Sequence, residues 1–166
     1  MEIAFERLTE EHRIAVIDIL NYHIEHTTAA YRAERVGYGH FDGFLNDAGI
    51  LSSYAIKADE EVIGFCILEY FKNLGNFRKT GDVMYFIKPG FTGKGIGREA
   101  LRRLERDALD NGMDRIVVDI SDGNEGSVRF HEKNGFREYG RLADCWNKFG
   151  KKLGIVFMEK VLGDGF

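Results

Sequence analysis

The apolar positions of this chain recur with two periods, and each period marks one kind of element. A spacing of three and four residues indicates a helix, whereas alternation or a short continuous apolar run indicates a strand. Helices are predicted over residues 9–20, 41–49, 93–111 and 124–134, and strands at 3–8, 51–59, 60–71, 82–87, 114–120 and 153–162. Thr9 can cap the first helix, and Gly135 is placed as a left-handed stop for the last. Residues 25–40 predict a loop or a broken helix.

The most informative unit spans residues 82–120: a strand, a glycine-rich turn, a helix and a second strand. The runs DVMYFI (82–87) and DRIVVDI (114–120) do not alternate, which is typical of strands buried on both faces. Such a connection is a right-handed βαβ crossover in nearly all known cases. Because the unit follows an antiparallel-looking meander, we expect an α/β fold in which a mixed sheet carries helices on both faces.

Composition narrows the classes of protein to consider. A length of 166 residues predicts a single domain over 1–166, and 44% hydrophobic and 30% charged residues are ordinary for a globular protein. The net charge of -4 argues against nucleic acid as a partner. Cys66 and Cys145 do not make a disulfide framework, which favours a reduced, cytoplasmic setting. No run approaches the roughly 18 apolar residues of a membrane span, so neither membrane insertion nor secretion is expected.

The glycine-rich turn has the composition of a phosphate cradle. Gly93, Gly95 and Gly97 come immediately before the apolar stripe of a helix, and without Cβ atoms their backbone N–H groups can approach an anion closely. The helix start adds unsatisfied donors and a partial positive charge, flanked by Lys94 and Arg98. The competing interpretation is a turn whose glycines serve backbone geometry alone. The spacing fits neither a Walker P-loop nor the dinucleotide-binding fingerprint.

The turn resembles a motif of one enzyme family. The segment TGKGIG (92–97) is similar to motif A of the GCN5-related N-acetyltransferase (GNAT) superfamily, whose loop binds the pyrophosphate of acetyl-CoA. Thr92 stands where that motif has Gln or Arg. Further segments resemble the phosphinothricin acetyltransferase branch and its bacterial amino-acid N-acetyltransferase relatives, in the same order over residues 3–161: 21–31, 76–90, 123–136 and 146–160.

The resemblance implies one N-acetyltransferase domain with a mostly antiparallel sheet that is splayed at its centre. It implies acetyl transfer from acetyl-CoA to a primary amine, with no metal. The residues implied to bind acetyl-CoA are Tyr85, Phe86 and Ile87 for the pantetheine arm, Gly93, Lys94, Gly95, Ile96, Gly97 and Arg98 for the diphosphate, and Asn124.

Two titratable residues occupy positions that the resemblance makes catalytic. Asp82 stands where the branch has a glutamate, and an attacking ammonium group needs a base there; an aspartate of pKa about 3.9 would need burial or a relay water. His131 stands where many relatives have tyrosine, and could protonate the departing thiolate. The alternatives are an acid capping a turn at the start of the strand for Asp82, and a core histidine for His131.

Acceptor binding is implied for three residues. Arg78 could grip a carboxylate with its guanidinium fork, and Phe77 and Tyr31 belong to segments beside the acceptor in the branch. A solvated arginine and simple core packing of the Tyr31 ring are the alternatives. Lys152 and Gly154 depart from the branch pattern, where Trp and Asp stand, so the acceptor is expected to differ from phosphinothricin or methionine derivatives.

The sequence therefore predicts a cytoplasmic N-acetyltransferase for a small amine, an amino acid or its analogue. The alternatives are a non-catalytic acyl-CoA-binding module and an acetyltransferase for a peptide or protein amine. A homodimer is expected by analogy with relatives.

Overall fold

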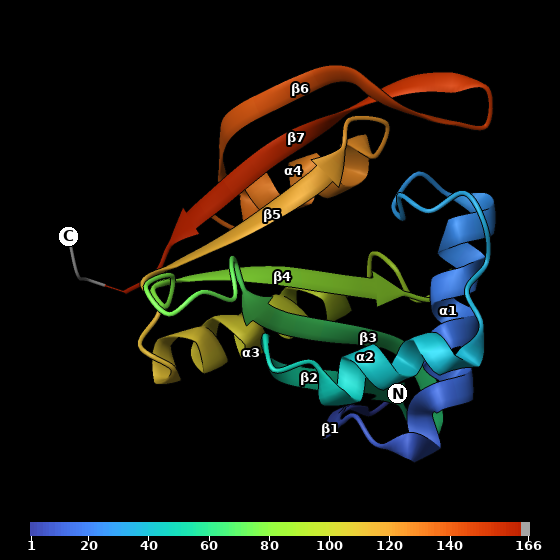
Figure 1. The fold of residues 1–166 in the computed structure, drawn as a ribbon. Helices are drawn as coiled ribbons and strands as arrows, with labels where there is room; N and C mark the ends of the chain where they lie inside the picture. Colours follow the sequence, from blue (N-terminus) through green and yellow to red (C-terminus); the bar gives the residue numbers. More distant parts are fainter. Residues whose placement is uncertain (164–166) are drawn as a thin grey trace.

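A computed structural model describes residues 1–163, which form one seven-stranded sheet flanked by helices (Figure 1). The strands are β1 (Ile3–Arg7), β2 (Ile50–Ala58), β3 (Glu61–Tyr70), β4 (Thr80–Ile87), β5 (Arg115–Ser121), β6 (Arg137–Lys148) and β7 (Lys151–Val161), in the spatial order β1-β2-β3-β4-β5-β7-β6. The helices are α1 (Arg13–His26), α2 (Phe41–Asn46), α3 (Ile96–Asp110) and α4 (Glu125–Lys133), with 3-10 turns at Glu10–His12 and Tyr38–His40. In the described part of the chain no helix is long and apolar enough to cross a membrane.

The centre of the sheet is a short parallel junction between β4 and β5. These strands pair from Thr80↔Arg115 to Asp82↔Val117, whereas the other neighbouring pairs are antiparallel. Past Asp82 the two strands diverge, and Figure 1 shows the sheet opening toward the side where α1 stands. The strand–helix–strand connection and the mixed, mostly antiparallel sheet splayed at its centre are therefore confirmed.

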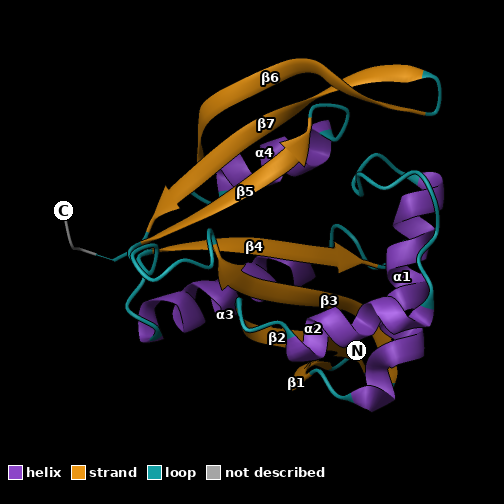
Figure 2. Cartoon of the chain, in the orientation of Figure 1, coloured by secondary structure: helices purple, strands orange, loops and turns teal. Residues whose placement is uncertain are grey.

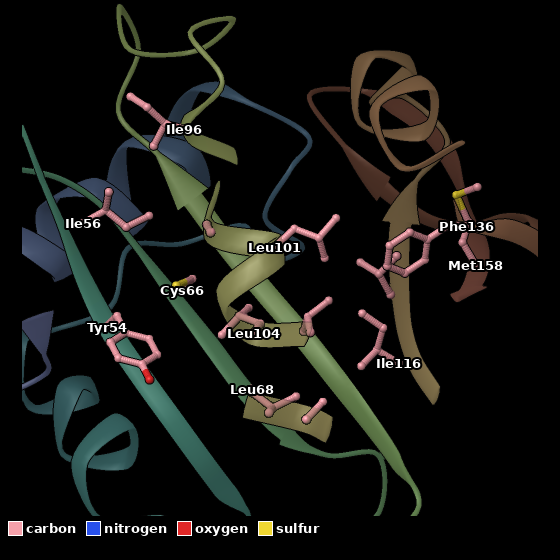
Figure 3. Packing of buried hydrophobic residues seen from close by; sticks show 14 of the residues in the cluster. Tyr54, Ile56, Cys66, Leu68, Ile96, Leu101, Leu104, Ile116, Phe136 and Met158 are labelled. Atoms are coloured by element: carbon pink, nitrogen blue, oxygen red, sulfur yellow. The ribbon is translucent and has the colours of Figure 1, made fainter. Parts of the chain in front are cut away.

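Helices cover both faces of the sheet, as the sequence predicts (Figure 2). On one face α1 and α2 bury Ile17 and Phe41 against Phe65 of β3. On the other face α3 packs Leu101 and Leu104 into a cluster that includes side chains from both halves of the sheet (Figure 3). The α3 side thus holds the two halves together, and the α1 side covers β2, β3 and β4.

One expectation about burial is wrong, and one strand was missed. In β4 only Gly81 and Val83 are buried, because β5 diverges and leaves the other residues of β4 at the edge of the splay. The 12-residue strand β6 was not predicted, since it lies at the edge of the sheet and most of its positions are exposed. Without a buried face, β6 has no apolar alternation for the sequence to reveal.

Gly64 of β3 lies where a side chain has no room. A Cβ atom there would sit 2.7 Å from the backbone oxygen of Phe86 in β4. Gly64→Ala should lower the free energy of unfolding by about 2 kcal/mol, as overpacking of a filled core does. Gly43→Ala in α2 is the matched control, because nothing lies within 4 Å of that Cβ position and alanine favours helix. Urea unfolding of both variants measures the difference; equal stabilities would contradict the close packing at Gly64.

Candidate active site

The glycine turn before α3 presents backbone N–H groups to its surroundings. Gly93 and Gly95 have φ angles of 73° and 82°, and nothing lies within 4 Å of their Cβ positions. Only glycine adopts this left-handed conformation readily. Gly95 caps α3, whose first hydrogen bond runs from the N–H of Glu99 to the Gly95 carbonyl. The N–H groups at positions 95–98 therefore lack helical partners and lie at the positive end of the helix dipole, which fits a phosphate group.

The backbone of β4 alternates between β3 and the splay. The N–H of Phe71 donates to the carbonyl of Thr80, and the N–H of Lys88 donates to that of Ile63. With the antiparallel register of β3 and β4, these bonds assign the even-numbered residues of β4 to the β3 ladder. The odd-numbered residues then direct their N–H and C=O groups toward the diverging β5: Val83, Tyr85 and Ile87.

This alternation decides which backbone groups an extended ligand could use. Tyr85 and Ile87 direct their backbone N–H and C=O groups toward the splay. The Ile87 carbonyl already accepts a hydrogen bond of 2.9 Å from Nε2 of His23 in α1. The backbone groups of Phe86 belong to the β3 ladder instead. Phe86 can therefore contribute its ring to the splay, but not main-chain pairing.

Two cavities meet at the splay. One of about 840 Å³, the turn-side cavity, lies between the glycine turn, the end of β4 and α4. The other, of about 510 Å³, the α1-side cavity, lies between β4, β5 and the loop after α1. Both are lined by Ala29, Tyr85, Phe86, Asn124 and Ser127. The arrangement can hold a long ligand from the turn side and a smaller one from the α1 side, with their ends meeting at Tyr85.

Asp82 lies in the α1-side cavity at the last paired position of β4. Its neighbour across the ladder is Glu69 of β3, and Asp119 stands two residues beyond its partner Val117 in β5. Burial, then the like charges of Asp119 and Glu69, raise the pKa of Asp82 to about 8. A carboxylate with such a pKa can take a proton from a substrate and release it near neutral pH.

His131 of α4 is 1% exposed and both of its ring nitrogens are engaged. Nδ1 lies 2.7 Å from the Ser127 carbonyl, which can only accept, so Nδ1 carries the proton. Nε2 then accepts a hydrogen bond from the hydroxyl of Tyr85. The Tyr85 ring also stacks on the imidazole ring. Burial lowers the pKa of His131 to about 4, and the imidazole is neutral at pH 7. With no proton on Nε2, the neutral His131 has none to donate to a ligand, and it holds the Tyr85 hydroxyl in place.

Asn124 joins the two cavities at the start of α4. Its side chain accepts a hydrogen bond of 3.3 Å from the N–H of Ser127, and it lines both cavities. The cap uses Oδ1, so the amide NH₂ group is left to bind a ligand. The predicted cofactor role and the capping role are therefore compatible in one side chain.

Comparison with known proteins agrees with this arrangement. The model described as "Acetyltransferase (GNAT) family" matches residues 10–136. The chain belongs to this family. The resemblance read from the sequence is thereby confirmed, together with the expected N-acetyltransferase activity and acetyl-CoA as its co-substrate.

Relatives at moderate identity support the same branch of the GNAT family. The L-amino acid N-acyltransferase MnaT of Escherichia coli is 28% identical, with 99% of this chain and 95% of the relative covered. The L-methionine sulfoximine/L-methionine sulfone acetyltransferase of Salmonella typhimurium is also 28% identical, with 90% and 89% covered.

Solved GNAT structures share the fold. A ribosomal-protein-alanine N-acetyltransferase from Brucella melitensis is 27% identical with a TM-score of 0.87, covering 98% of this chain and 100% of that one. A phosphinothricin acetyltransferase from Sinorhizobium meliloti in complex with AcCoA has a TM-score of 0.90 at 20% identity, covering 99% and 91%. At that identity the second likeness concerns the fold alone.

Most residues predicted to bind acetyl-CoA in this GNAT chain do line the turn-side cavity: Tyr85, Phe86, Ile87, Gly93, Gly95, Gly97, Arg98 and Asn124. The side chains of Lys94 and Ile96 do not. The Lys94 ammonium lies 5.5 Å from the centre of the Phe91 ring, and Ile96 is buried in the core. Only their backbone N–H groups lie at the turn.

The predicted acceptor residues separate into two groups. Tyr31 lines the α1-side cavity and packs edge-on against Trp146, with ring centres 5.0 Å apart. Phe77 and Arg78 lie in the β3–β4 loop and line neither cavity; the Arg78 guanidinium lies 4.1 Å from the centre of the Tyr70 ring. The arginine that does line the α1-side cavity is Arg32.

Sequence reasoning also missed three polar residues of the site. Asp119 and Glu69 line the α1-side cavity, and His23 lines the turn-side cavity. Asp119 did carry a signal, since it is the one charged residue inside the apolar run IVVDI. Glu69 and His23 carried none, because only strand pairing and helix docking bring them to the splay.

The buried imidazole makes stability depend on pH. The folded-state pKa of His131, about 4, lies below the value of about 6.5 in the unfolded chain. The unfolded chain therefore binds the proton first, and His131 destabilises the fold as the pH falls from 6.5 toward 4. Relative to His131→Gln, the parent chain should lose up to about 3 kcal/mol over this range. Urea unfolding at pH 7, 5.5 and 4 tests it; parallel pH profiles would show that His131 is not buried neutral.

Proposed function

We propose that the chain, as one N-acetyltransferase domain over residues 1–166, acetylates the primary amine of a small molecule of the amino-acid type. The carrying observation is Asp82, whose pKa is raised to about 8 in the α1-side cavity, and this cavity shares Tyr85 with the turn-side cavity. The relatives named as L-amino acid N-acyltransferase and L-methionine sulfoximine/L-methionine sulfone acetyltransferase support this class of acceptor.

The turn-side cavity is the proposed site of acetyl-CoA, which supplies a thioester to the reaction. The backbone N–H groups at 95–98 and the Arg98 guanidinium would hold the diphosphate, because they combine free donors with positive charge. The splay-facing backbone groups of Tyr85 and the Asn124 amide would hold the arm. These groups pre-organise the donor and leave the α1-side cavity to the acceptor.

Asp82, or a water that it holds, removes a proton from the acceptor's ammonium group. The freed lone pair on nitrogen attacks the carbonyl carbon, and the C–N bond forms. When the resulting tetrahedral centre collapses, the C–S bond breaks and its electron pair leaves on sulfur. As the amide forms, its nitrogen releases a second proton, which balances the proton that the sulfur takes up when CoA leaves as the thiol. His131 is neutral and carries no proton on Nε2, so we assign it the role of holding the Tyr85 hydroxyl in place.

For an amino-acid acceptor, Arg32 is the better-placed guanidinium for the carboxylate than the predicted Arg78, because only Arg32 lines the α1-side cavity. A peptide amine is the second candidate acceptor. The carboxylates of Glu69, Asp82 and Asp119 in that cavity favour it, as does the likeness to a ribosomal-protein-alanine N-acetyltransferase. The homodimer and the cytoplasmic location stay predictions.

A panel of acceptors separates these functions. The purified chain is mixed with acetyl-CoA and with amino acids, simple amines or peptides with free N-termini, and release of the CoA thiol is followed. We expect amino acids to be preferred. Preference for peptides would select the second candidate, and calorimetric binding of acetyl-CoA without turnover of any amine would identify a non-catalytic acyl-CoA-binding module.

Asp82→Asn removes the base with little change in shape. We expect kcat to fall by about 10²–10³-fold, the usual contribution of a general base, while acetyl-CoA affinity stays the same. Because the base must be ionised, kcat/KM of the parent should rise with pH up to about 8. Asp110→Asn, at the exposed end of α3, is the charge-matched control. Full turnover by Asp82→Asn at neutral pH would remove Asp82 from the mechanism.

A further inference from the structure

We propose that Asp119 binds the acceptor's ammonium group beside Asp82, so that two carboxylates divide the work of the acceptor site. Asp119 holds the ammonium group, and Asp82 receives its proton. The inference rests on the proposed transfer to an amine and deepens it by naming the group that positions the nucleophile.

The strand register places the two carboxylates on one face. Asp82 pairs with Val117 across the parallel junction, and paired residues of neighbouring strands point to the same side of the sheet. Asp119 follows Val117 by two residues, so it also stands on this side, at the point where the strands begin to separate. Both residues line the α1-side cavity.

Position 119 is the exposed point of β5. Its neighbours in β5 are buried, namely Ile116, Val117, Val118, Ile120 and Ser121, and Asp119 is the exposed exception in the strand. Because the α1-side cavity leaves position 119 open, a carboxylate there stays hydrated and is accessible to a ligand that enters the cavity. The position makes sense if the carboxylate meets a ligand in the cavity.

The α1-side cavity holds more carboxylates than positive charges: Glu69, Asp82 and Asp119 line it together with Arg32. The ionisable groups around Asp82 come from every element that lines the cavity: Glu69 from β3, Asp119 from β5, Tyr31 and Arg32 from the loop after α1, His40 from the adjoining 3-10 turn, Tyr85 from β4 and His131 from α4. Within residues 1–163, Glu69, Asp82 and Asp119 take part in no ion pair. A bound ammonium group would supply the missing partner.

Burial separates the tasks of the two carboxylates. Asp82 is partly buried, whereas Asp119 is exposed to the cavity. The Tyr31 hydroxyl lies close enough to Asp119 for that carboxylate, after burial, to raise the pKa of Tyr31. A phenol O–H that donates to Asp119 would fix the carboxylate toward the ammonium group. In the proposed step one proton passes from nitrogen to Asp82, and Asp119 exchanges none.

Kinetics of Asp119→Asn across pH test the inference. Loss of the charge should raise KM for the amine about tenfold, the usual effect of one charge-assisted hydrogen bond. It should also move the acid limb of the kcat/KM profile down by about one pH unit, because Asp82 ionises more easily without a like charge beside it. Asp119→Glu keeps the charge and should keep the limb near its original pH.

Asp114→Asn is the matched control, since it removes one carboxylate just before β5 and away from both cavities. Its KM and pH profile should equal those of the parent. Thermal unfolding and calorimetric acetyl-CoA binding check that each variant is folded, and Asp119→Ser replaces Asp119→Asn if the latter is not.

The outcomes distinguish a failure of the role assigned to Asp119 from a failure of the proposed amine acetylation. If the parent acetylates amines and neutral variants at 119 change neither KM nor the acid limb, the role of Asp119 is overturned and the proposed function stands. A raised KM with an unmoved limb would also overturn it, because a merely structural defect predicts that result. If the parent releases no CoA thiol with any amine, both proposals fail.

Discussion

The short parallel junction between β4 and β5 is the constraint on which the site depends. Three residue pairs hold the strands together, and beyond Asp82 they separate. Separation leaves the odd-numbered backbone groups of β4 without a strand partner, and buried polar groups of this kind require one. It also opens the sheet between two cavities. The last paired residue is therefore neither in the core nor in bulk water, and Asp82 occupies that position.

A split sheet needs other connections, and the structure provides them on both sides. The core cluster around α3 contains residues from both halves, such as Cys66 of β3 and Met158 of β7. On the opposite side, the loop after α1 is anchored twice. The Asn21 side chain exchanges two hydrogen bonds with the backbone of Val36, and the buried Lys148 donates to the Ala30 carbonyl over 2.6 Å. The wall of the α1-side cavity is thus fixed from α1 and from β6.

The sequence was most informative where a local rule operates. The glycine turn and α3 follow from conformational preference and helical period, so their positions were predicted closely. Burial of β4 and the position of Arg78 were not predictable, because they depend on where β5 diverges and how a loop folds back on Tyr70. The proton on Nδ1 of His131 also lay beyond the sequence, since it requires the Ser127 carbonyl one helical turn away.

The aspartate in place of a glutamate need not mean that the base has been lost. A shorter side chain is held closer to the backbone and to the carboxylates of neighbouring strands, and those charges add to burial in raising the pKa of Asp82 to about 8. The same arrangement opposes folding: with the folded pKa raised from 3.8, the unfolded chain ionises first, so stability falls as the pH rises toward 8. His131 destabilises in the opposite direction, below pH 6.5. Between pH 4 and 6.5 the two effects therefore oppose each other, and above pH 6.5 only the loss from Asp82 remains, so stability falls toward pH 8. Such a cost is expected when residues are placed for chemistry and not for packing.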